Sequence, residues 1–259
     1  MIRQIRKMVL FATLLGSFVV ISTMAQFIIR TRHRRRRFLA RLVSIESKLA
    51  LRAFQVQVNR SGLSDLDPAA HLIVSNHLGY LDILVLASLL PCAFVTSVEI
   101  RNTPFLGWLT ELAGCLYVER RSREKLGVEI SDIRHELERG LNVCIFPEAT
   151  STNGAGVLRF RKPLYNAAIE SGRPVLPICL NYLSIEGQPV SIENRDFLFW
   201  YGEMAFLSHL WSFFSRTEIV VSVEAGDCVC STQYQCPQIL AEKTHSMVQA
   251  RFRPISATI

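Results

Sequence analysis

The stretch from His71 to Asp82 reads HLIVSNHLGYLD and decides how the chain around it folds. The apolar run Leu72 to Val74 ends at a polar turn, and a longer apolar run, Ile83 to Leu90, follows. This order predicts a strand, a turn and a helix. His77 and Asp82 are five residues apart, which is about 140° around a regular helix. They therefore meet only where His77 lies on the turn and Asp82 at the start of the helix.

Two interpretations of this pair stay open on these residues alone. A histidine held in one tautomer by a carboxylate is a general base, whereas a polar turn capped by Asp82 explains the same letters without chemistry. Two later segments bear on the choice. Gly114 to Arg121 reads GCLYVERR, and Phe146 to Gly154 reads FPEATSTNG. The first is a short apolar strand that delivers two arginines, and the second is a hydroxyl-rich loop that follows an apolar strand.

Together these segments carry a family resemblance. The blocks N-H-x4-D, G-x-L-Y-V-x-R and F-P-E-x-T-S, followed by V-L-P at 175–177, have the order and spacing typical of lysophospholipid acyltransferases. The chain resembles the 1-acylglycerol-3-phosphate acyltransferases over roughly Leu51 to Ile185. The resemblance implies that His77 deprotonates the hydroxyl of a lysophospholipid and that Asp82 orients the imidazole. The hydroxyl then attacks an acyl thioester, acyl-CoA or acyl-carrier protein, and no cofactor or metal is required.

The resemblance also implies an acceptor site. Arg120 is expected at the phosphate, because a planar guanidinium pairs with two phosphate oxygens. Ala149 and Ser151 stand where the family has glycine and arginine. Either Arg159, Arg161 and Lys162, just downstream, replace the missing cation, or the acceptor is another lysolipid such as a lyso-ornithine lipid. The predicted substrate-binding residues are Asn76, Arg120, Glu148, Thr150, Ser151 and Arg159.

Charge and hydropathy point to a membrane. Met8 to Ile29 holds no charged residue, and seven arginines follow between Arg30 and Arg41, equal to the formal net charge of +7. As a helix the apolar segment is about 33 Å long, enough to cross a hydrocarbon core of ~30 Å. A signal peptide is disfavoured because the arginines resist translocation. A basic band beside an apolar segment favours anionic lipids over nucleic acid as partners.

The apolar periodicities predict an α/β fold with a mixed, largely buried central sheet flanked by helices and preceded by an N-terminal membrane helix. We expect a membrane anchor over residues 1–59 (helix 8–29, basic cluster 30–41, then a second amphipathic helix over 38–54) and a catalytic domain over 60–259. The anchor spans the membrane once or lies in its interface, with the catalytic domain on the cytoplasmic side. Strands are expected at 54–58, 72–74, 93–97, 115–118, 143–146, 175–180 and 219–223, with helices at 83–90, 105–113, 126–137, 164–169 and from Pro237.

Two alternatives to an acyltransferase of 1-acylglycerol-3-phosphate stay open. One is O-acyl transfer to a different lysolipid, and the other is a non-catalytic lipid-binding relative. The four residues His77, Asp82, Arg120 and Glu148 disfavour the second, because a protein that only binds lipid has no chemical need for all of them. Seven cysteines, several within apolar runs, indicate reduced thiols rather than disulfides. Their spacing near the C-terminus is poor for zinc.

Overall fold

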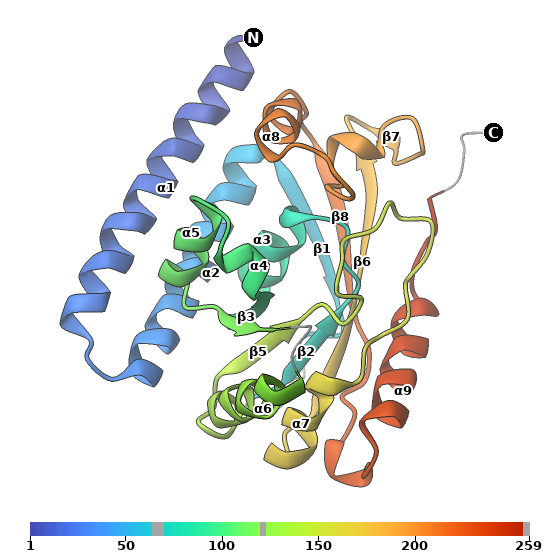
Figure 1. Ribbon diagram of the computed structural model, residues 1–259. Helices are drawn as coiled ribbons and strands as arrows, with labels where there is room; N and C mark the ends of the chain where they lie inside the picture. Colours follow the sequence, from blue (N-terminus) through green and yellow to red (C-terminus); the bar gives the residue numbers. More distant parts are fainter. Residues whose placement is uncertain (64–69, 120–122, 256–259) are drawn as a thin grey trace.

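The computed structural model describes residues 1–63, 70–119 and 123–255. Its strands form one central sheet in the order β1-β8-β6-β2-β5-β3-β4, with β7 paired to β6 (Figure 1). The strands are β1 Val56–Ser61, β2 Leu72–Ser75, β3 Cys92–Ser97, β4 Leu116–Val118, β5 Asn142–Ile145, β6 Val175–Ile185, β7 Gln188–Pro189 and β8 Ile219–Ala225.

The middle of the sheet is parallel. Leu72 of β2 pairs with Val143 of β5 on one side and with Val175 of β6 on the other, and both pairings are parallel. These strands are runs of apolar residues because helices cover both faces, as is typical of parallel sheets. Strand β8 pairs antiparallel to β6, so the sheet is mixed. The predicted mixed α/β class is therefore confirmed.

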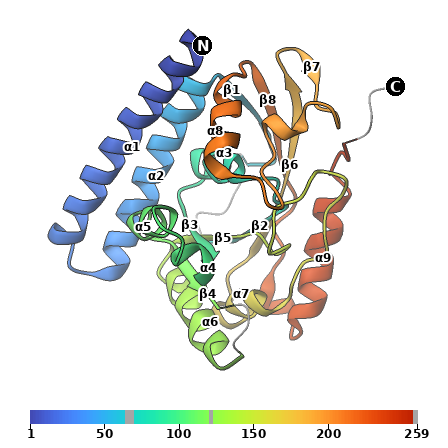
Figure 2. The same cartoon turned by 45° about the horizontal axis from the view of Figure 1, so that its top comes forward.

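Two layers of helices enclose the sheet. Helices α2 and α3 cover one face, where Phe54 and Leu81 are buried, and α6, α7 and α9 cover the other, where Ile133 and Leu240 are buried (Figures 1 and 2). The helices are α1 Ile2–Ile28, α2 Arg32–Phe54, α3 Tyr80–Leu89, α4 Val98–Arg101, α5 Leu106–Leu112, α6 Arg123–Glu138, α7 Asn166–Ser171, α8 Phe206–Phe214 and α9 Pro237–Gln249, with single 3-10 turns η1 Pro163–Tyr165, η2 Arg195–Phe197 and η3 Ser231–Gln233.

The N-terminal helix α1 lies along α2 rather than standing apart from the domain (Figure 2). It begins at Ile2 instead of Met8, because Lys7 is accommodated inside the protein. The Lys7 ammonium donates a hydrogen bond of 3.0 Å to the carbonyl oxygen of Phe54, the last residue of α2, and another to the carbonyl oxygen of Arg216. A cation is favourable at the C-terminal end of a helix. This contact attaches α1 to the domain.

The structure differs from the predicted elements in several further places. Helix α2 begins at Arg32, so most of the basic cluster is helical, with Arg36 buried at its centre. Strand β6 continues to Ile185, five residues past the predicted end at Leu180, because β8 pairs with it there. Helix α8 falls in an aromatic-rich stretch for which no element was predicted. The strand expected at 54–58 forms as β1 at the edge of the sheet, but it runs from Val56 to Ser61, because α2 continues through Phe54.

Candidate active site

The topology brings two of the sequence blocks together. Strand β2 ends at Ser75, two residues before His77, and the neighbouring parallel strand β5 ends at Ile145, directly before Phe146. The carboxyl ends of adjacent parallel strands share one edge of a sheet, the edge at which α/β proteins place their sites. As a result the His77 ring stacks on Phe146, with ring centroids 3.9 Å apart and planes inclined by 14°.

His77 and Asp82 form a close pair at this edge. The Nδ1 atom of His77 lies 2.8 Å from Oδ2 of Asp82, a carboxylate that is fully buried. The same oxygen accepts the backbone N–H groups of Leu78, at 2.6 Å, and Gly79, at 3.0 Å. Because this oxygen only accepts, Nδ1 carries the proton and donates it. Nε2 is then the unprotonated nitrogen, with no hydrogen bond to the described residues, on a side chain that is 20% exposed.

Tyr182 completes the surroundings of Asp82 and was missed by the sequence reasoning. Its hydroxyl donates to Oδ1 of Asp82 at 2.7 Å, and both residues are buried. Burial raises the pKa of Tyr182 well above its usual value, with the negative charge of Asp82 adding to the effect, so the group stays a phenol that can donate. One sequence signal could have identified Tyr182. Alternate residues of a strand lie on the same face of a sheet, so a β6 that continues past Leu180 has Tyr182 on the face of Leu180.

The backbone of His77 is held as firmly as its ring. Its N–H donates to Oε1 of Glu148 at 2.7 Å, and its carbonyl oxygen accepts the N–H of Thr152 at 2.9 Å. The other carboxylate oxygen of Glu148 accepts the N–H of Leu158 at 2.7 Å. The FPEATS segment therefore fixes the turn that carries His77. Through these backbone contacts the N-H-x4-D and F-P-E-x-T-S blocks, far apart in the sequence, form one site.

Glu148 holds these contacts in a buried position. Burial raises the pKa of its carboxyl group from the ordinary 4.5 to about 7, the N–H groups of Leu158 and His77 oppose the shift, and the charge of Asp82 adds to it. Between these two values the folded protein binds a proton that the unfolded chain releases. The stability that this group contributes is thus fully present below pH 4.5 and is lost as the pH rises through about 7.

We therefore expect the stability of the wild type relative to a Glu148→Gln variant to fall across that pH range. The measurement is denaturant unfolding of both proteins in detergent at a series of pH values. The variant removes the titrating group, so the difference between the two free energies of unfolding isolates it. A difference that does not change with pH would contradict the assignment.

Asn76 is fully engaged inside the protein. Its side-chain amide donates to the carbonyl oxygen of Leu180 at 3.0 Å and accepts the N–H of Leu180 at 2.8 Å. The side chain thus continues the β2–β6 pairing past the end of β2. It is 1% exposed, with both polar atoms used. The structure gives Asn76 a contact that positions the turn, and none that reaches outward to a substrate.

The hydroxyl residues after Glu148 lie at the open side of the loop. Thr150 is exposed and Ser151 half-buried. Ala149, which replaces the family's glycine, has φ 62°, a left-handed conformation that costs an alanine about 1 kcal/mol. The loop therefore keeps a backbone suited to glycine in spite of the substitution. The remaining departure from the family pattern is chemical: a hydroxyl stands at Ser151 in place of a cation.

The two arginines predicted to meet the substrate have different outcomes. Arg120 lies outside the described residues. Arg159 is directed to Glu242 of α9, with 3.9 Å between Nη2 and Oε1, and 79% of its side chain is exposed. The preceding residue, Leu158, donates its N–H to Glu148, but the side chain of Arg159 is paired with Glu242 and has no described contact with His77. Its place in the acceptor site gains no support from this geometry.

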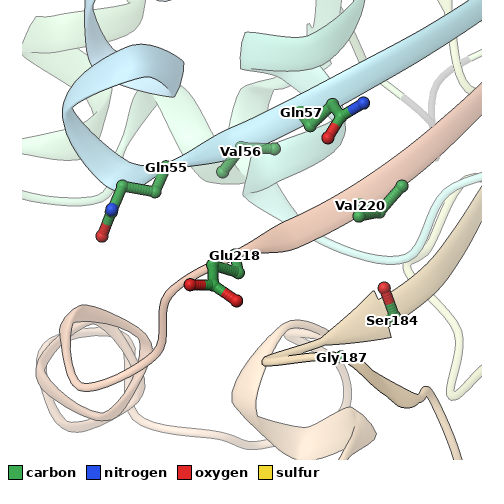
Figure 3. Close-up of a pocket in the computed structure, with 7 residues that line it drawn as sticks. All are labelled: Gln55, Val56, Gln57, Ser184, Gly187, Glu218 and Val220. Atoms are coloured by element: carbon green, nitrogen blue, oxygen red, sulfur yellow. The ribbon is translucent and has the colours of Figure 1, made fainter.

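One recess in the described part of the chain is separate from this site. It measures about 500 Å³ and lies where β1, β8 and β6 adjoin (Figure 3). Gln57, Ser184 and Val220 line it from three neighbouring strands, and no residue of the His77 site takes part. It is an open area of the sheet surface.

Comparison with known proteins relates the chain to acyltransferases. Residues 57–181 match the family model described as Acyltransferase. A 1-acyl-sn-glycerol-3-phosphate acyltransferase of Neisseria gonorrhoeae is 29% identical over 190 residues, 73% of this chain and 71% of that protein. A lyso-ornithine lipid O-acyltransferase of Pseudomonas aeruginosa is 36% identical over 130 residues, 50% and 49% of the two chains. The crystal structure of the 1-acyl-sn-glycerophosphate acyltransferase of Thermotoga maritima has the same fold, with a TM-score of 0.65 at 19% identity over 96% and 95% of the two chains.

Fold and sequence together define an α/β acyltransferase. Its sequence is similar to lysophospholipid acyltransferases, both to 1-acyl-sn-glycerol-3-phosphate enzymes and to lyso-ornithine lipid enzymes.

Proposed function

We propose that this acyltransferase moves a fatty acyl group from an acyl thioester to the free hydroxyl of a lysophospholipid, with His77 as the general base. The observation that carries the proposal is the pair itself, because Asp82 holds Nδ1 and leaves Nε2 free to take a proton. The acceptor oxygen forms the new C–O bond as it loses its proton to Nε2. The C–S bond of the thioester then breaks, and the thiolate leaves with the proton from the imidazolium. Coenzyme A and acyl-carrier protein are the candidate donors.

The acceptor we favour is 1-acylglycerol-3-phosphate, which would give phosphatidic acid. A relative named for this substrate is 29% identical over 73% of the chain, and Arg120 is the residue that we propose for the acceptor phosphate. One observation favours a second candidate, a lyso-ornithine lipid. Ser151 stands where the family pattern has an arginine, in a loop whose backbone keeps the left-handed turn at Ala149. Loss of a cation from this loop suits a less anionic acceptor.

A panel of acceptors decides between these candidates. Membranes that contain the protein are offered lysophosphatidic acid or lyso-ornithine lipid with each donor, and the product is read by mass spectrometry against a His77→Ala control. A His77-dependent product from lysophosphatidic acid supports the first candidate, and a product only from lyso-ornithine lipid supports the second. Absence of product from every acceptor would overturn both and leave a lipid-binding relative.

We further propose that α1 lies in the interface of the cytoplasmic leaflet instead of crossing the bilayer. Helix α1 is long and apolar enough to span. However, Lys7 and Phe11 attach its first turns to the domain, and Ser17 donates to Glu46 of α2 at 3.1 Å near its middle. If α1 crossed the bilayer, the polar helix α2 that is packed against it would have to enter the hydrocarbon core. An N-terminal tag should be reached from the same side of the membrane as the C-terminus, and opposite sides would refute this placement.

A further inference from the structure

A second recess lies beside the turn between α1 and α2, away from His77. It measures about 300 Å³, and its walls come from the end of α1, the first turns of α2, helices α4 and α5, and the start of β4. Its lining includes four arginines and a single carboxylate: Arg32, Arg35, Arg36, Arg101 and Glu111. Such a concentration of guanidinium groups in a concave site suits an anion.

Three of these guanidinium groups already have acceptor partners, and the buried Arg36 is held most firmly. Arg36 is buried and donates to the carbonyl oxygen of Gly114 at 2.9 Å and to Glu136. Arg32 lies 3.3 Å from Asp132. Arg101 donates to Glu111 at 2.9 Å and lies over the ring of Tyr117, 5.0 Å from its centroid. Donors fixed in advance lose little side-chain entropy when a ligand arrives.

Arg35 differs from the other three. Within the described residues its hydrogen bond is a long one, 3.4 Å to the carbonyl oxygen of Ile29, and it pairs with no carboxylate there. It is half-buried at the wall of the recess. The recess thus contains one positive charge without a counter-ion, beside guanidinium groups that are already oriented. A phosphate is a group that such planar, forked donors bind with two oxygens at once.

The position of the recess indicates where the phosphate comes from. Phe27 and Ile28, at the end of α1, are 79% and 71% exposed, and Gln26 beside them lines the recess. Apolar side chains at the tip of the α1–α2 hairpin suit lipid tails, and arginines directly beside them lie at headgroup depth. Phosphate and apolar surface within one turn of helix match an intact phospholipid better than a free phosphate ion.

We propose that this recess binds the phosphate of one anionic phospholipid, such as phosphatidylglycerol, as a resident lipid separate from the acceptor and donor sites. The inference rests on the proposed membrane placement of α1, and not on the chemistry at His77. The bound lipid fixes the hairpin at the membrane surface. Beneath it, β4 runs from the recess toward Glu119, the residue before Arg120.

Native mass spectrometry of the full chain in detergent tests this site, with phosphatidylglycerol added. The wild type should retain one lipid molecule, and Arg35→Gln should lower the retained fraction at least about tenfold, the effect of one hydrogen bond between charged groups. Arg34→Gln is the matched control. Arg34 precedes Arg35 in α2 and carries the same charge, but it does not line the recess. It should retain the lipid as the wild type does.

Further arms keep the result interpretable. Arg101→Gln alters the opposite wall and leaves Glu111 without its partner, so it should also lose the lipid even if Arg35→Gln fails to fold. His77→Ala should retain it, which separates this site from catalysis. Equal loss in Arg34→Gln and Arg35→Gln would show diffuse attraction to the basic cluster and overturn the proposal. Displacement of the lipid by inorganic phosphate at comparable concentration would overturn the claim that the ligand is a phospholipid.

Discussion

A His77→Ala enzyme should transfer acyl groups more slowly than the wild type by a factor on the order of 10³, the usual contribution of a positioned general base. The reason is geometric. Nε2 is the ring atom left without a partner when Asp82 holds Nδ1, and no other described histidine is paired in this way with a carboxylate at the edge of the sheet. The measurement is the rate of product formation at saturating donor and acceptor.

The fold should survive this change, which makes the prediction decisive. The backbone contacts of His77 to Glu148 and Thr152 remain in the variant, and the side chain removed is partly exposed. His135→Ala is the matched control, since His135 is exposed on α6 and should leave the rate unchanged. Turnover close to that of the wild type in a folded His77→Ala protein would show that another group takes the proton.

Local pattern accounts for what could be predicted here. The strand, turn and helix around His77 were recognisable because a buried parallel strand is a short apolar run and the turn after it is polar. The spacing of His77 and Asp82 allowed their contact only with His77 on the turn and Asp82 at the start of the helix, and the family resemblance decided for it. In both cases neighbouring residues along the chain determine the outcome.

What could not be predicted depends on contacts between distant segments. Tyr182 reaches Asp82 because β8 extends β6 beyond Leu180, and sequence does not reveal which strands become neighbours. Burial of Lys7 depends on carbonyl groups more than 40 residues away, at Phe54 and Arg216. The residue type of Asn76 shows that its side chain is polar. Its direction is set by a contact with the backbone of Leu180 in β6, which the sequence does not reveal.

An Asp82→Asn enzyme should lose activity by a factor on the order of 10², the difference between a charged and a neutral hydrogen bond to the imidazolium. The backbone N–H groups of Leu78 and Gly79 point at Oδ2, so the amide oxygen of the asparagine takes that position. It still accepts from Nδ1 of His77, and the correct tautomer is kept. The loss then comes from the missing negative charge alone. The measurement is kcat with both substrates saturating.

Tyr182 provides the test of that orientation. In Asp82→Asn the amide nitrogen faces Tyr182, whose hydroxyl turns to accept instead of donating. Tyr182→Phe alone removes one hydrogen bond from the carboxylate, and its effect on kcat should stay below about tenfold. In the double variant the buried amide has no acceptor. The loss of activity in the double variant should therefore exceed the product of the losses in the two single variants. Losses that simply multiply would mean that the asparagine has turned over, with its nitrogen toward His77. The tautomer would then be wrong and the loss from Asp82→Asn alone nearer 10⁴-fold, as expected when a base is held with its proton on the wrong nitrogen.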